Sequence, residues 1–229
     1  MSEAGRRAVI ALALLAAIVA FATRAHGLAA VREEPELTPQ VRAATLNVDA
    51  VAPQDRAWIL AAIAGARPEA RRVIDEIDGL VTINGDLNAP GMIIPGSEGA
   101  IGLARFEGGH GEISLDVRAL DGDRAIDRSM VVLHELGHIV DFLLVDDELM
   151  HQLDAGIPPA GPCESLSQDY GPCTAIEERF ADTFAKWALR GRFSLAGSGY
   201  GIPTPPSLED WGVPLARLAA ELDIKARED

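Results

Sequence analysis

The spacing of apolar and polar positions divides the first half of the chain into helical and extended stretches. Two stretches carry apolar residues at helical spacing, and each opens with a proline: 53–66 and 68–78. Gly79 then follows as a stop signal. Three shorter runs, separated by turns rich in Gly, Asn and Pro, are typical of strands: 80–83, 101–106 and 112–117.

The second half of the chain returns to helical spacing. The pattern predicts one long helix over about 124–145 and another over about 174–190, with a Gly/Pro-rich loop at 155–173 between them. After further glycines and prolines at 197–206, residues 214–226 are typical of an amphipathic closing helix. Helices, then strands, then helices indicate an α+β domain rather than alternating βα units.

The N-terminal residues have the pattern of an export signal. Arg6 and Arg7 precede the uninterrupted apolar run 8–22, which predicts a signal peptide over 1–27. The alternative is an uncleaved membrane anchor, although the run is short for a bilayer span. Either interpretation places the remainder outside the cytoplasm, secreted or anchored by 8–22. Residues 28–52 lack a sustained apolar period and are expected to be a linker, which leaves 53–229 as the domain.

Composition and charge limit the kinds of molecule that the protein is expected to bind. The 229 residues hold 20 Lys+Arg against 35 Asp+Glu, a net charge of −15, which argues against nucleic acid as a partner. A membrane is expected as a partner only through the N-terminal segment, if that segment is not cleaved. Outside the cytoplasm, the two cysteines, Cys163 and Cys173, are expected to form one disulfide. Thiolate metal ligation would require closer spacing and more thiols.

The first long helical stretch contains His134-Glu135-Leu136-Gly137-His138. Residues i and i+4 share one face of a helix, so both imidazoles can reach one metal ion. Glu135 would lie beside that ion and could take a proton from a water molecule. The alternative is a helix with two histidines that are merely part of the core.

Two histidines leave a catalytic zinc site short of its usual third protein ligand. Neither His110 nor His151 has supporting spacing. A carboxylate at the start of the second long helix is more plausible, and spacing alone leaves Glu177 and Glu178 equally possible. Asp182 follows Glu178 by one helical turn, where it could orient a ligand.

These motifs resemble those of the gluzincin metallopeptidases, and among them the anthrax lethal factor-like group. Residues 134–141 match that group's H-E-x-G-H-x-x-D run, and 178–184 match its E-x-F-A-E-A-F run, with Asp for the second Glu and Thr for the second Ala. The resemblance covers roughly 125–190. It implies a zincin-like fold, in which a small, mostly antiparallel sheet packs on the H-E-x-x-H helix and on a second ligand-bearing helix.

The resemblance also implies a role for each matching residue. One Zn²⁺ per chain would be held by three residues: His134, His138 and Glu178. Glu135 would be the general base, and Tyr170 would stabilise the oxyanion. Asp141 and Asp182 would orient the ligands.

The function expected from the sequence is an exported zinc metallopeptidase acting on a peptide or protein substrate. A zinc-binding domain without protease activity and a zinc amidase acting on non-peptide amide bonds are the alternatives. Substrates of zincins pair with an edge strand, for which 112–117 is the candidate. An ordinary internal strand is an equally good interpretation of that run.

Overall fold

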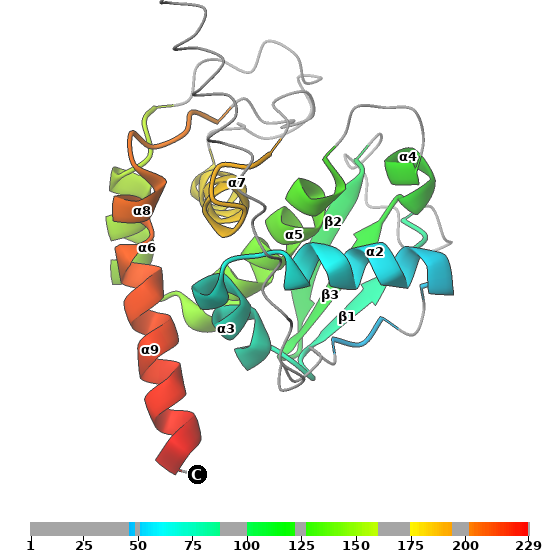
Figure 1. Ribbon diagram of the computed structural model, residues 1–229, viewed down its shortest axis with the longest axis horizontal. Helices are drawn as coiled ribbons and strands as arrows, with labels where there is room; N and C mark the ends of the chain where they lie inside the picture. Colours follow the sequence, from blue (N-terminus) through cyan, green and yellow to red (C-terminus); the bar gives the residue numbers. More distant parts are fainter. Residues whose placement is uncertain are drawn as a thin grey trace, which may run out of the picture. The chain divides into compact units, whose positions relative to one another are not determined.

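The structure is a computed structural model that describes residues 46–48, 51–87, 100–121, 127–159, 175–193 and 202–228 (Figure 1). All of them lie in one compact unit, Arg42–Asp229. The helices of this part are α2 (Pro53–Ala64), α3 (Pro68–Glu76), α4 (Val117–Asp121), α5 (Arg128–Leu144), α6 (Asp147–Ala155), α7 (Ile176–Ala188), α8 (Leu208–Trp211) and α9 (Val213–Glu228). The strands are β1 (Val81–Asn84), β2 (Gly102–Glu107) and β3 (His110–Leu115). Among these helices, none has the length and apolar character needed to cross a membrane.

Helix starts follow local sequence chemistry. Helices α2 and α3 each begin at a proline, whose fixed φ and missing N–H suit the first helical position. The Asp127 side chain accepts a hydrogen bond from the Met130 N–H and caps α5. Asp146 caps α6 in the same way. The start of α5, the helix that carries both histidines, is therefore determined by its own sequence.

The three strands form one mixed sheet in the order β1-β3-β2. Strand β1 pairs with β3 in parallel, and β2 pairs with β3 antiparallel. The α+β class is thus confirmed, whereas the sheet is mixed rather than mostly antiparallel.

The candidate edge strand at 112–117 is an internal strand instead, because β3 is paired along both sides. Its inward side chains, Ile113 and Leu115, are buried, and Val117 already belongs to α4. In the described sheet, the antiparallel edge is β2.

The C-terminal end of the expected linker is part of the domain. Leu46, Val48 and Val51 are buried in the core, and Asn47 bridges to Thr82 of β1. Three apolar side chains within six residues are too few to show a period, so the sequence pattern did not reveal this contribution.

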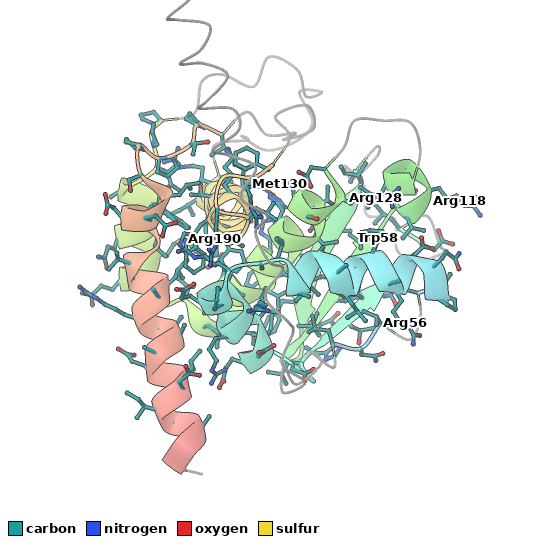
Figure 2. All side chains as sticks on the ribbon, viewed as in Figure 1. Arg56, Trp58, Arg118, Arg128, Met130 and Arg190 are labelled. Atoms are coloured by element: carbon teal, nitrogen blue, oxygen red, sulfur yellow. The ribbon has the colours of Figure 1, made fainter. Side chains whose placement is uncertain are left out.

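Helix α5 is the centre of the packing. It lies against the sheet, where a Cβ at Gly111 of β3 would be 3.0 Å from the Ile139 side chain. Helix α2 packs on α5 near its start, where the Arg128 guanidinium lies over the Trp58 ring at 5.5 Å (Figure 2). On its other flank α5 meets α7, seen end-on in Figure 1, which separates α5 from α6 and α8.

The aromatic side chains of α7 are buried against α8. The Phe180, Phe184 and Trp187 rings contact one another and Trp211. The Trp211 indole N–H donates to the Leu153 carbonyl at 2.9 Å, which ties α8 to α6. The sequence pattern did not predict either of these short helices. The predicted closing helix is present as α9, which packs along α3.

Candidate metal site

Helix α5 places two imidazoles side by side. His134 and His138 are one turn apart, their Nε2 atoms are 3.2 Å apart, and their rings meet edge-on at 85°. His134 is buried and His138 is half-buried. Their Nε2 atoms therefore converge on one point beside α5, as the i,i+4 spacing predicted.

Helix α7 brings a carboxylate to the same point. Glu178 Oε2 lies 3.2 Å from His134 Nε2, and Glu178 Oε1 lies 3.6 Å from His138 Nε2. Glu177 is exposed and is not part of this group. Of the two carboxylates that spacing left open, the structure thus brings Glu178 to the histidines.

A close helix crossing makes this meeting possible. Gly137 of α5 faces Ala181 of α7, and a Cβ at Gly137 would be 3.0 Å from the Ala181 Cα. Glycine within a helix costs about 1 kcal/mol relative to alanine. Here its missing side chain lets the two backbones approach, so that Glu178, one turn before the crossing, reaches both histidines.

The three donors fit a metal ion. Four ligands at about 2.0–2.1 Å around a tetrahedral zinc are roughly 3.3–3.4 Å from one another. Here the two Nε2 atoms are 3.2 Å apart, and the two carboxylate oxygens of Glu178 lie 3.2 and 3.6 Å from them. Glu178 Oε2 is also buried. His134, His138 and Glu178 therefore form a group that could bind a metal ion.

The charges of this group compensate one another when no metal is bound. Burial alone would raise the pKa of Glu178, but its contacts with His134 and His138 hold that pKa well below the usual range. Burial alone would lower the pKa of His134, but the contact with Glu178 and nearby carboxylates raises it. Because metal ligands must be deprotonated, metal binding is expected to weaken at acidic pH.

Glu135 lies between the donor group and the edge strand. Its side chain is buried against β2, where a Cβ at Gly102 would overlap its carboxyl group. The Ala104 N–H donates a hydrogen bond to this carboxyl group. Burial raises the pKa of Glu135, and the positive charge of the two histidines opposes that rise. The predicted base is thus at the outer edge of β2, next to the metal-binding group.

Asp182 is held by a partner that the sequence reasoning missed. Lys186 Nζ lies 2.5 Å from Asp182 Oδ2 and also donates to the Ile202 carbonyl at 2.5 Å. Both charged side chains are almost inaccessible, at 1% and 2% exposed. The negative charge of Asp182 acts on His134. A lysine one turn after an aspartate, inside an apolar helix, was the available signal for this pair.

The remaining residues singled out from the sequence lie outside the donor group or outside the described part of the chain. Burial raises the pKa of Asp141, one turn after His138, to about 6. Tyr170, Cys163 and Cys173 lie outside the described residues, so the oxyanion and disulfide hypotheses remain predictions. His110 and His151, which lacked supporting spacing, are both exposed and are not part of the donor group.

The chain matches no protein-family model, no curated protein and no solved structure. Its function must be inferred from the chemistry of the site: two imidazoles and a carboxylate that can hold a metal ion, and Glu135 beside them.

Proposed function

We propose that this protein is an exported, zinc-dependent metallopeptidase of the gluzincin type. His134, His138 and Glu178 hold one zinc ion, since two imidazoles, one carboxylate and a remaining open position are the donor set of catalytic zinc. The observation that carries the proposal is the convergence of these donors beside the buried carboxyl group of Glu135. An α+β domain with a small sheet on the H-E-x-x-H helix supports a zincin-like fold.

The metal ion and the residues around it would have separate roles in peptide hydrolysis. When bound, zinc lowers the pKa of a water molecule towards about 7 and polarises the peptide carbonyl. Glu135 accepts the proton of the attacking water and returns it to the leaving nitrogen, which is the role of a general base that becomes a general acid. Asp182 and Lys186 form a buried ion pair within α7, and Lys186 also donates to the Ile202 carbonyl, which ties the ligand helix to the segment before α8.

Within the described residues, no strand pairs with the outer edge of β2, and this edge offers a place for an extended peptide. The Asp116 N–H donates to the Ile101 carbonyl, so alternate residues from Ile101 onward direct their backbone groups to β3. The backbone groups of the residues between them, Gly102 and Ala104, consequently face away from β3. The Ala104 N–H is already bonded to Glu135, so a peptide paired with the remaining groups of this edge would pass Glu135.

Export rests on the sequence pattern of residues 1–27. If this segment is a signal peptide, N-terminal sequencing of the protein recovered outside the cytoplasm will begin shortly after it. An intact N-terminus in the membrane fraction would instead support an anchor at 8–22.

The test of activity uses purified protein and its Glu135→Gln variant, each loaded with zinc. A pool of unstructured peptides is incubated with both proteins, and new peptide termini are identified by mass spectrometry. We expect cleavage by the wild type, none by Glu135→Gln, and equal zinc content in both. Zinc binding without hydrolysis would favour a non-proteolytic zinc domain. Hydrolysis of non-peptide amides alone would favour an amidase.

A further inference from the structure

A pair of stacked phenylalanine rings lies on the surface that carries the site. Phe106 of β2 and Phe142 of α5 have ring centroids 5.6 Å apart and planes only 7° from parallel. Phe142 is 54% exposed, and no other aromatic side chain appears among the large exposed apolar residues of the described part. An isolated exposed apolar residue is ordinary. These two rings, however, are stacked on each other, and they come from α5, which carries the histidines, and from β2, which contacts Glu135.

Helix geometry places Phe142 beside the donor group. His134, His138 and Phe142 follow one another at intervals of four residues, so they share one face of α5. Phe142 is one turn beyond the second histidine. The exposed ring is therefore a continuation of the face that binds the metal ion.

Strand geometry places Phe106 beside the base. Ala104, whose N–H bonds to Glu135, and Phe106 are two residues apart on β2. Their side chains consequently lie on the same face of the strand, about 6.6–6.8 Å apart along it. The backbone of Phe106 also faces away from β3, because it continues the alternation of Gly102 and Ala104. The ring thus lies at the edge of β2 that no described strand covers, next to the Ala104 carbonyl, whereas the Ala104 N–H is bonded to Glu135.

We propose that Phe106 and Phe142 form a substrate-recognition surface that selects a large apolar or aromatic side chain. The inference rests on the proposed peptidase function. An extended peptide paired with the edge of β2 directs every second side chain to the same face. The peptide residue two positions from the one beside Glu135 would therefore lie on the two rings. The two rings bind a substrate side chain, because they are continuous with the metal-binding face of α5 and with the edge of β2 that no described strand covers.

The size of the effect follows from the chemistry of apolar pockets. One methylene in such a pocket changes kcat/KM by about 10- to 200-fold when it is fully enclosed. Phe106 and Phe142 form an open surface rather than an enclosed pocket. We therefore assign only the lower end of that range of kcat/KM to the whole substrate side chain. We expect phenylalanine or leucine at that peptide position to be preferred over alanine by about tenfold.

The experiment compares kcat/KM of the zinc-loaded full chain on a peptide series that differs only at the position two residues from the cleaved bond. The variants are Phe142→Ala and the matched control Ile224→Ala, which removes a similarly exposed apolar side chain on α9. We expect Phe142→Ala to keep its zinc and reduce the preference to less than threefold, while Ile224→Ala retains the full preference.

Three results would overturn the inference. An unchanged preference in Phe142→Ala would refute the recognition surface while leaving the peptidase function intact. Absence of cleavage by the wild type would refute the function and the inference together. Self-association of the wild type that Phe142→Ala abolishes, with no change in preference, would assign the rings to a contact between two copies of the chain. Light scattering of the same samples distinguishes that last case.

Discussion

Substitution of Gly137 by alanine tests whether the close crossing of α5 and α7 assembles the metal site. The added Cβ would lie 3.0 Å from the Ala181 Cα, 3.3 Å from its carbonyl oxygen and 3.3 Å from the Phe184 ring. Carbon atoms in contact prefer about 3.5–4.0 Å. The helices must therefore separate by roughly 0.5–1 Å. A change of the Ala181 side chain could not relieve this crowding, because two of the three contacts are with the Ala181 backbone.

Such a separation exceeds the tolerance of metal coordination. Ligand distances in metal sites stay within about 0.2 Å of their ideal values. Gly137→Ala moves Glu178 relative to both histidines, and we expect zinc affinity to fall by roughly 10- to 100-fold, as for other changes that misplace a ligand. Stability should change less. Overpacking costs about 1–3 kcal/mol, but the helix gains about 1 kcal/mol from alanine, which leaves a net loss of about 0–2 kcal/mol.

The assay is competition for zinc with a chromophoric chelator, combined with urea unfolding of the metal-free protein. The matched control is Gly65→Ala, because Gly65 ends α2 at φ −76° and its nearest neighbour is a carbonyl of that same helix. Gly65→Ala should bind zinc as the wild type does. Wild-type zinc affinity in Gly137→Ala would show that this crossing does not position Glu178.

The remaining predictions concern the surroundings of the site. Lys186→Met leaves the Asp182 carboxylate buried without its ion pair, so urea unfolding should show a loss of about 3–5 kcal/mol, much of which the double variant with Asp182→Asn should recover. In the metal-free protein the folded-state pKa of Asp141, about 6, lies above its usual 3.8, so its contribution to stability is lost as pH rises from about 4 to 6. Asp141→Asn should therefore be more stable than the wild type at pH 7 and equally stable below pH 4, and an equal difference at both pH values would contradict this. Trp211→Phe removes the donor to the buried Leu153 carbonyl and should cost about 1–2 kcal/mol in unfolding experiments; no loss would show that water replaces the indole.

The elements with strong local signals could be predicted from the sequence. The proline starts of α2 and α3 and the apolar spacing of α5 and α7 each depend on neighbouring residues, and these helices are present within a few residues of their predicted ends. The order of the strands could not be predicted. Which strand is central depends on contacts between segments far apart in the chain, such as Val81 with Gly111. Alternation within 112–117 does not encode those contacts.

The same distinction holds for the site. The pairing of His134 with His138 follows from helical periodicity alone. The choice of Glu178 over Glu177 depends on the rotation of α7 about its axis, which is determined where Gly137 meets Ala181. The position of Glu135 at Gly102 depends on the packing of α5 on β2 and has no local signal. Phe106 and Phe142 are in contact through that same packing, although 36 residues separate them in the sequence.

The metal content of the purified wild type, Glu178→Ala and Glu177→Ala would test whether the chain is a three-ligand zinc protein. Glu177 and Glu178 are adjacent carboxylates in the first turn of α7, so the two variants are matched in charge and in their effect on the helix. We expect about one zinc per chain in the wild type and in Glu177→Ala, and a strong loss in Glu178→Ala. A wild type that binds no metal after zinc is added, or a Glu178→Ala variant that retains it, would contradict the proposed site.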